Sequence, residues 1–250
     1  MEKSLRQEII LNEIHIHNRV LLSDLANILQ VSIDTVRRDL KEMDEAKKIK
    51  RVHGGAVSMG FNIYNEQRSH IYAYENKAII AQKGISLLKK GDVVLISGGT
   101  TNLELAKLLP QKLDLTFFTP SLPMAIELLN SPAKNEVIFI GGKLSKNSQL
   151  STGGSAINLL SEIKADICFL GTGYLDPLNG ITEIDWEIAQ LKKAMIAASK
   201  KVVSLTISEK LNTINRYKIC DINTLDVLVT EMDPNTPKLQ AYRNQGLTIL

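Results

Sequence analysis

The sequence predicts an α/β protein of two domains: a small helical domain with a β-hairpin, followed by a domain built on a doubly wound, mostly parallel sheet. Two observations predict this. Within residues 1–58, apolar side chains recur three times at the spacing of short amphipathic helices. From Lys77 onward, short and continuously apolar runs alternate with helical patterns, which is typical of parallel strands covered by helices on both faces. The length of 250 residues is enough for two such domains.

The composition excludes several classes of protein. Hydrophobic residues make up 44% of the chain and charged residues 23%, as in ordinary globular proteins. Aromatic residues make up only 5%, which argues against a surface that stacks RNA bases. The two cysteines, Cys168 and Cys220, lie in apolar runs, and we expect buried free thiols in a reducing cytoplasm.

No membrane partner, metal or cofactor is expected. No apolar run approaches the roughly 20 residues of a membrane helix, and acidic residues within residues 1–30 argue against a signal peptide. His15 and His17 lie two positions apart, so they do not share a helix face as metal ligands would. The sequence has neither a Walker loop nor a GxGxxG pattern, and it supports no Ser-His-Asp arrangement. We expect a cytoplasmic protein.

Two helices are expected before residue 30. Apolar residues at helical spacing between Leu5 and Ile14 predict the first helix. The apolar residues of segment 21–29 predict a second, short amphipathic helix, and Ser23-Asp24 can cap its start.

A tight connection at residues 30–32 leads into a third helix. Ser32 is a good N-cap for it, and Asp34 in its first turn is favourable to the helix dipole. The apolar side chains that fall on one side of this helix, facing the core, are Ile33, Val36, Leu40 and Met43. The polar side chains presented around its N-terminal half are Ser32, Thr35, Arg37 and Arg38.

Two β-prone stretches around Gly54-Gly55 predict a hairpin directly after the third helix. Two short helices joined by a tight turn, the second basic on its free face, are what a helix-turn-helix needs to enter a major groove, and the hairpin would be a wing beside it. Between Arg37 and Arg51, seven basic residues outnumber four acidic ones, which is a weak electrostatic footprint for nucleic acid. We expect double-stranded operator DNA to be contacted by Ser32, Thr35, Arg37, Arg38, Lys41, Arg51, His53 and Gly54.

The chain is predicted to divide near residue 58. Residues 1–58 form the DNA-binding domain, residues 59–76 form a linker because they lack a sustained period, and residues 77–250 form the second domain. Any coupling between the two domains would have to pass through this linker.

Strands and helices are expected to alternate in the second domain. The predicted strands cover residues 93–96, 115–118, 137–140, 167–170, 202–205 and 227–229. The predicted helices cover residues 78–91, 100–109, 121–130, 156–162 and 186–199. The sheet predicted by this alternation is parallel and covered on both faces.

Ligands of such sheets bind in the loops at the carboxyl ends of the strands. After the first strand, Ser97-Gly98-Gly99-Thr100-Thr101 opens a helix, and its converging N–H groups, threonine hydroxyls and helix N-terminus predict a phosphate cradle. The next three strand ends also carry small, polar or glycine-rich loops, which favours a single binding crevice. These loops add the candidate residues Thr119, Ser121, Gly141, Gly142, Lys143 and Gly171.

The two segments 31–40 and 51–56 together resemble the winged helix of the DeoR-type bacterial repressors of sugar metabolism. The resemblance implies that Arg37 and Arg38 meet DNA, whereas Asp39, close to the apolar side, is expected to brace an arginine. Residues 77–250 resemble the sugar-phosphate-sensing domain of the same family, which is similar to ribose-5-phosphate isomerase. That resemblance implies effector-binding roles for Gly99-Thr100-Thr101, Gly141-Gly142, Lys192 and Lys210.

Three positions depart from the family pattern. Ser97 stands where the family usually has Asp, Pro120 where Asn is usual, and Ser145 where Arg commonly follows the Gly-Gly turn. These departures weaken the case for an ordinary sugar-phosphate effector.

The function expected from the sequence is a DNA-binding transcriptional regulator, a repressor of carbohydrate-metabolism genes. A small phosphorylated sugar-type metabolite would control it, and the second domain would assemble a homodimer or homotetramer. Two alternatives remain open: an isomerase-like enzyme acting on sugar phosphates, and a constitutive DNA-binding protein whose second domain only forms oligomers.

Overall fold

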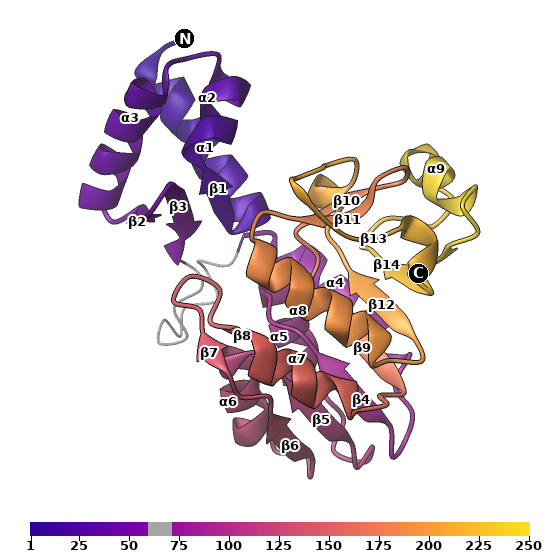
Figure 1. Cartoon of the computed structure of the whole chain (residues 1–250). Coiled ribbons are helices and arrows are strands. Elements are labelled where there is room, and N and C mark those ends of the chain that lie inside the picture. Colours follow the sequence, from indigo (N-terminus) through magenta and orange to yellow (C-terminus); the bar gives the residue numbers. More distant parts are fainter. Residues whose placement is uncertain (60–71) are drawn as a thin grey trace. The chain divides into compact units, whose positions relative to one another are not determined.

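The computed structural model describes residues 1–59 and 72–250, and it divides into two compact units, Met1–Tyr72 and Ala73–Leu250 (Figure 1). Most of the predicted linker, residues 60–71, lies outside the described residues.

The first unit combines three helices with a small antiparallel sheet (Figure 1). Its elements are α1 (Lys3–His17), β1 (Arg19–Leu21), α2 (Leu22–Leu29), α3 (Ile33–Glu45), β2 (Ile49–Val52) and β3 (Gly55–Ser58). The strand order is β1-β3-β2. The apolar faces of the three helices meet in one core, whose fully or nearly fully buried members include Ile10, Ile14, Leu25, Leu29, Val36, Leu40 and Met43.

The start of the second helix differs from the prediction. Asn18 adopts a left-handed conformation (φ 62°) at the end of α1, and residues 19–21 then pair with β3 as an unpredicted strand. The N-cap of α2 is consequently Leu21, without a side-chain cap, so the predicted cap at Ser23-Asp24 is wrong. A three-residue strand is too short to leave a period in the sequence, which is why it was missed.

The second unit is built on a seven-stranded sheet in which every pairing is parallel. Its strand order is β15-β14-β12-β9-β4-β5-β6. The strands are β4 (Val93–Ile96), β5 (Thr116–Thr119), β6 (Glu136–Phe139), β9 (Ile167–Leu170), β12 (Val202–Leu205), β14 (Val227–Val229) and β15 (Thr248–Ile249). The order reverses between β4 and β9, so the two loops that follow these strands open the crevice of the sheet.

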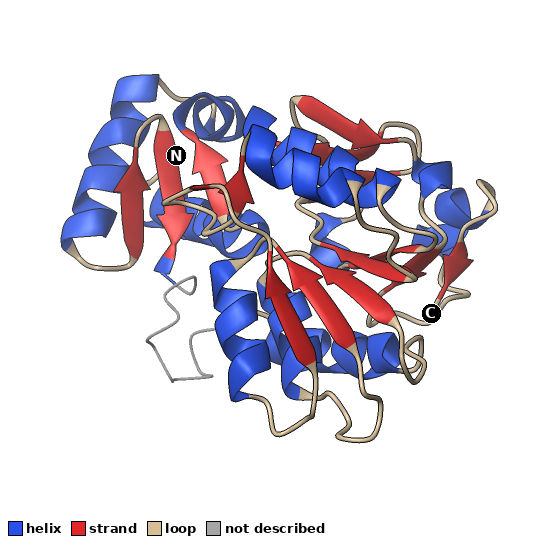
Figure 2. Ribbon diagram, turned by 60° about the horizontal axis from the view of Figure 1, so that its bottom comes forward, coloured by secondary structure: helices blue, strands red, loops and turns tan. Residues whose placement is uncertain are grey.

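Helices lie on both sides of this sheet (Figure 2). On one side, α4 (Tyr74–Ile85) packs against α5 (Thr100–Lys107), which packs against α6 (Leu122–Asn130). On the other side, α7 (Gly154–Ser161) packs against α8 (Trp186–Ala197), and α8 contacts β9. The doubly wound parallel sheet predicted from continuous apolar runs is therefore confirmed, and β9 and β12 are buried at every position.

Several short elements of the second unit were not predicted. They are the hairpin of β7 (Lys143–Leu144) and β8 (Ser151–Thr152), the antiparallel sheet of β10 (Tyr174–Asp176), β11 (Gly180–Glu183) and β13 (Tyr217–Cys220), the helix α9 (Gln240–Arg243) and the edge strand β15. Three short 3-10 helices, at Ser208–Lys210, Ile222–Thr224 and Pro237–Leu239, complete the elements assigned here. The residues between β9 and α8 therefore supply two strands of a small sheet, and β13, which follows β12, supplies the third.

Both cysteines are free thiols, as predicted. Cys168 lies in the middle of the large sheet between Leu95 and Val202, and burial raises its pKa to about 12. Burial also raises the pKa of Cys220 to about 11. Neither thiol is primed for nucleophilic or redox chemistry, because such cysteines need a depressed pKa.

Candidate functional site

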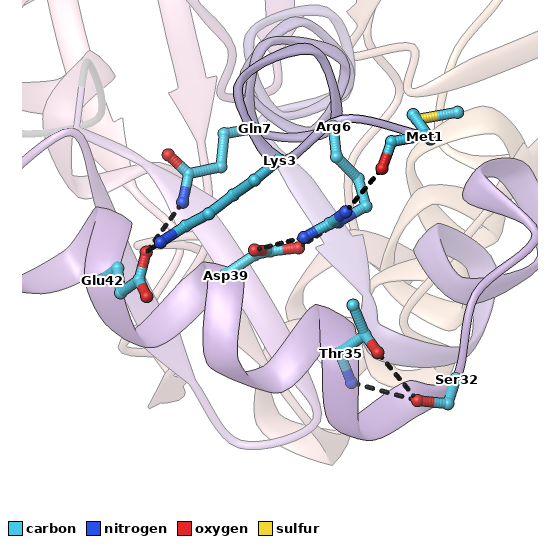
Figure 3. A network of polar contacts seen from close by, with 8 residues as sticks. All are labelled: Met1, Lys3, Arg6, Gln7, Ser32, Thr35, Asp39 and Glu42. Atoms are coloured by element: carbon cyan, nitrogen blue, oxygen red, sulfur yellow. Dashed lines mark hydrogen bonds and ion pairs between the residues drawn. The ribbon is translucent and has the colours of Figure 1, made fainter.

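The first turn of α3 is capped as predicted (Figure 3). The Ser32 Oγ accepts a hydrogen bond from the Thr35 backbone N–H at 3.2 Å. The Ser32 and Thr35 hydroxyls also bond to each other at 2.9 Å. Both hydroxyls are thus engaged within the turn, so base contacts by these two residues would compete with the cap.

The basic residues of α3 point to solvent. Arg37 is paired with Asp34 one turn earlier, and both side chains are more than half exposed. Lys41 Nζ lies 3.8 Å from Glu45 Oε1, and both side chains are exposed. Arg38 is exposed and has no ion-pair partner among residues 1–59 and 72–250. Arg37 and Lys41 would each have to leave a neighbouring carboxylate before binding a phosphate or a base. Among the described residues Arg38 has no such pair, so it can bind without breaking one.

The predicted hairpin is present, and its two glycines have different roles. Val52 pairs with Gly55, which leaves His53-Gly54 as a two-residue turn in which Gly54 has a φ of 78°. Gly55 lies in β3, where a Cβ atom would come within 1.9 Å of the Val20 carbonyl oxygen. Only glycine avoids strain or collision at these two positions.

The hairpin is hydrogen-bonded to the helices at two points, one in its turn and one in β2. The Gly54 carbonyl accepts a hydrogen bond from the Leu22 backbone N–H at 2.9 Å. The Arg51 backbone N–H donates to Asp44 of α3 at 3.0 Å. The side chains of Arg51 and His53 are exposed. The hairpin thus presents a cation from β2 and an imidazole from its turn, and it is hydrogen-bonded to α2 and α3.

A buried ion pair fixes α3 against α1 (Figure 3). Arg6 Nε donates to Asp39 Oδ2 at 2.6 Å, and Arg6 Nη2 donates to Asp39 Oδ1 at 3.0 Å. The two side chains are 12% and 3% exposed, and the hydrogen bond to Asp39 raises the pKa of Arg6. The expectation that Asp39 braces an arginine is confirmed. The sequence pattern did not identify Arg6 as the partner, because the two residues are 33 positions apart.

An exposed pair lies beside the buried one. Lys3 Nζ lies 2.6 Å from Glu42 Oε2, which also accepts a hydrogen bond from Gln7 Nε2 at 3.0 Å (Figure 3). The hydrogen bond from Lys3 lowers the pKa of Glu42. Lys3 therefore joins α1 to α3 in this structure.

In the second unit, the loops after β4 and β9 approach each other closely. A Cβ atom on Gly171 would lie 2.5 Å from the Gly98 carbonyl oxygen and 3.2 Å from Ser97 Oγ. Gly99 is the N-cap of α5 with a φ of 123°, and it has open space on its Cβ side. No side chain caps α5 and no acid lies in its first turn. The N-terminus of α5 therefore keeps its partial positive charge for an anion.

Asn102 joins these two loops and was not singled out from the sequence. Its amide Nδ2 donates to the Ser97 carbonyl at 3.1 Å and to the Phe169 carbonyl at 3.2 Å, and the residue is buried. One amide thus bridges the ends of β4 and β9 at the point where the strand order reverses. A buried asparagine in the first turn of a helix is the signal that could have found it, because buried amides need partners.

Thr119 and Ser121 are buried, and their hydroxyls accept hydrogen bonds from backbone N–H groups at the start of α6. Thr119 Oγ1 accepts from the Ser121 N–H at 3.1 Å, and Ser121 Oγ accepts from the Met124 N–H at 3.4 Å. Gly141, Gly142 and Lys143 lie exposed at the start of the β7–β8 hairpin. The hydroxyls of Thr119 and Ser121 are thus engaged with the start of α6, whereas Gly141, Gly142 and Lys143 are open to solvent.

Lysines gather at the carboxyl ends of β9 and β11. Lys210 Nζ donates to the Thr172 carbonyl at 2.9 Å, directly after Gly171. Lys192 Nζ lies 2.5 Å from Glu183 Oε2, and both side chains are buried. Glu183 also lies beside Gly173 and accepts from the Ile184 N–H at 2.8 Å. Both predicted lysines therefore lie at the loop of residues 171–173, whose Gly171 approaches Gly98 in the predicted cradle.

A third lysine, Lys77 of α4, belongs to the same cluster and was missed. It is 3% exposed, and burial lowers its pKa to about 8. Burial, followed by repulsion from Lys77 and Lys192, lowers the pKa of Lys210 to about 7. Glu183 and Glu209 attract the Lys210 amine, and Glu209 and Glu104 attract the Lys77 amine, but burial dominates and both pKa values stay lowered. A bound anion would favour the protonated form of such amines. We refer to Lys77, Lys192 and Lys210 as the lysine cluster.

Other chemistries find no support in the described residues. No group of three or more His, Cys, Asp or Glu side chains among them could hold a metal ion. No helix within residues 1–59 or 72–250 has both the length and the apolar character needed to cross a membrane.

Comparison with known proteins gives one consistent answer. Residues 6–60 match the family model described as the DeoR-like helix-turn-helix domain, and residues 72–232 match the DeoR C terminal sensor domain. The chain is 31% identical to the HTH-type transcriptional regulator GolR of Listeria innocua, over 98% of this chain and 96% of that protein. It is also 31% identical to the HTH-type transcriptional repressor GlcR of Bacillus subtilis, over 96% of this chain and 93% of that protein.

Among solved structures, ribose 5 phosphate isomerase A from Neisseria gonorrhoeae is similar to part of this chain. The identity is 14% and the TM-score 0.40, over 55% of this chain and 53% of that one. A similarity this weak supports no conclusion about function.

Replacing Asp39 by Ala should destabilise the first unit by about 2–4 kcal/mol, because it leaves the Arg6 guanidinium buried without its carboxylate. Hydrogen exchange of the α1 and α3 amides should accelerate accordingly. Glu42→Gln, in the exposed pair, is the matched control and should leave exchange nearly unchanged. Equal protection in Asp39→Ala and the unmodified protein would show that the pair does not hold the two helices together.

Proposed function

Because this chain belongs to the DeoR family of transcriptional regulators, we propose that α3 and the β2–β3 hairpin hold operator DNA and that a phosphorylated sugar-type metabolite controls this binding. The expectation of a regulator rather than an isomerase-like enzyme is confirmed, since relatives along nearly the whole chain are named as regulators. The name of GlcR favours a repressor. We propose carbohydrate-metabolism genes as the targets and the cytoplasm as the place of action.

The DNA contacts are proposed from the exposed cations of α3 and the hairpin. Arg37, Arg38 and Lys41 lie on the side of α3 away from its buried residues, and Arg51 and His53 lie on the hairpin. Arginine suits both guanine edges and phosphates. The Arg6–Asp39 pair supports the proposal, because it anchors α3 by its inner side and leaves the outer side free for a groove.

The effector site is proposed at the N-terminus of α5, between residues 97–101 and the loop at 171–173. The observation that carries this proposal is the lysine cluster beside an uncapped, glycine-led helix N-terminus. Converging backbone N–H groups and amines form the standard environment for a phosphate ester. Thr100 and Thr101 would add hydroxyl donors in the first turn of α5.

The lysine cluster also offsets the departures from the family pattern. Ser145 lies in the β7–β8 hairpin, where its hydroxyl accepts from the Ser148 N–H at 3.5 Å, so it brings no charge to the crevice. Ser97 is fully buried. Lys77, Lys192 and Lys210 supply three amines to this region, where Glu183 pairs with Lys192 and Glu209 attracts both Lys77 and Lys210. We therefore keep a phosphorylated ligand as the proposed effector despite the missing arginine.

The second unit is proposed to assemble a homodimer or homotetramer. The first unit has almost equal numbers of basic and acidic residues, so one copy offers few net charges to DNA, and affinity should come from linked copies. A two-fold dimer would place half-sites about 34 Å apart, or a multiple of that distance.

Replacing Arg38 by Ala should weaken DNA binding at least tenfold without unfolding the protein, because Arg38 is exposed and forms no internal ion pair among the described residues. A gel-shift titration at fixed salt, against genomic fragments recovered by the purified protein, measures this. Lys112→Ala, an exposed charge of the second unit, is the control and should bind normally. Normal binding by Arg38→Ala would remove Arg38 from the interface.

Replacing Thr100 by Val should weaken binding of the sugar phosphate that best stabilises the protein in a thermal-shift screen. The change removes a hydroxyl from the first turn of α5 and keeps the side-chain shape. Calorimetry should show a loss of about five- to tenfold, near 1 kcal/mol. Equal affinity would contradict the cradle, and a screen without any shift would favour a domain that only forms oligomers.

Effector affinity should fall as the pH rises from 7 to 9. The pKa of Lys210 is about 7 and that of Lys77 about 8, so the amines lose protons in this range. A bound anion favours the protonated amines, so binding takes up protons. For each proton taken up, the affinity falls by up to about tenfold per pH unit. A phosphate ester, with its second pKa near 6, stays dianionic throughout this range.

The control for this pH dependence is Lys210→Arg, because a guanidinium stays charged across the whole range. Its affinity should vary less with pH than that of the unmodified protein. An identical pH profile in the two proteins would show that Lys210 does not face the ligand.

A further inference from the structure

The first residue of α3, Ile33, is apolar and lies in solvent. The sequence places it with Val36, Leu40 and Met43 on the core side, and the structure corrects this: those three side chains are at most 2% exposed, whereas Ile33 is 45% exposed. Ile33 directly follows the N-cap Ser32, so it lies at the very end of the helix that would enter the groove. An exposed isoleucine at that point contributes nothing to the core of the first unit.

The polar neighbours of Ile33 are engaged with one another. The hydroxyls of Ser32 and Thr35 bond to each other, and Ser32 caps the helix. Asp34 is paired with Arg37. In the first turn of α3, the polar side chains are therefore bonded to one another, and Ile33 is the apolar side chain exposed beside them.

Base chemistry gives this arrangement a specific use. The N-terminal residues of a recognition helix contact base edges in the major groove, and thymine alone presents a methyl group there. We propose that Ile33 reads the 5-methyl group of a thymine in each half-site of the operator. This rests on the proposed use of α3 as the helix that enters the groove, and it adds a base preference to that proposal.

The surroundings of Ile33 favour DNA over an apolar protein partner. Arg37 and Arg38 are exposed one turn further along the same helix, and an apolar protein surface would have to desolvate these cations, whereas DNA phosphates would neutralise them. An exposed isoleucine elsewhere in the unit, Ile28 of α2, is 51% exposed and offers a matched comparison.

The test compares thymine with uracil, which lacks only the methyl group. The full-length protein selects its sites from random duplexes, and each thymine of the best site is then replaced by uracil in turn, with affinity measured at one salt concentration. One thymine per half-site should prove sensitive, with a loss of roughly fourfold, as expected for burying one methyl group. Ile33→Ala should bind the thymine duplex more weakly and show no further loss with uracil at that position.

Ile28→Ala should discriminate thymine from uracil as the unmodified protein does. The proposal fails if Ile33→Ala retains the full discrimination, because another group then reads the methyl, and it also fails if no thymine is sensitive. The role of α3 itself is judged separately, by the loss of affinity for all duplexes in Arg38→Ala.

Discussion

A helix that contacts DNA must leave one face uncovered by the rest of its domain. It can therefore be anchored only through the opposite face. In the first unit this constraint is met by the Arg6–Asp39 pair, a two-pronged hydrogen bond between α1 and the inner face of α3. The close-packed apolar side chains of Val36, Leu40 and Met43 are buried on this inner face. The bidentate ion pair adds a directional constraint on the orientation of α3, because both nitrogen–oxygen contacts must be satisfied together.

The second unit meets a comparable constraint at the ends of β4 and β9. The reversal of strand order separates the helices that follow these strands, and Asn102 bridges the two carbonyl groups at that point. Gly171 then allows the two loops to approach, because a Cβ atom there would lie 2.5 Å from the Gly98 carbonyl oxygen. The proposed cradle is thus formed mainly by backbone, and the charged groups around it come from elements far apart in the sequence.

Local patterns predicted most of the fold and only part of the site. Continuous apolar runs located β4 and β9 to the residue, and Ser32 identified the start of α3, because these features depend on nearby residues. Lys77 and Arg6 were missed because their roles depend on partners in distant elements. Ile33 was misplaced because a helical period extended to the first turn takes no account of where the neighbouring helices end.

Lys77 links the charge of the lysine cluster to the start of α4. It lies in the first turn of α4, the helix that directly follows residues 60–71 and Tyr72-Ala73. Repulsion from Lys77 is one of the causes that lower the pKa of Lys210, and by reciprocity a charge that favours protonated Lys210 also changes the protonation of Lys77. Proton binding and anion binding at the lysine cluster are thus thermodynamically linked. An anion bound beside Lys210 would raise the pKa of that amine by the same free energy by which protonation strengthens anion binding.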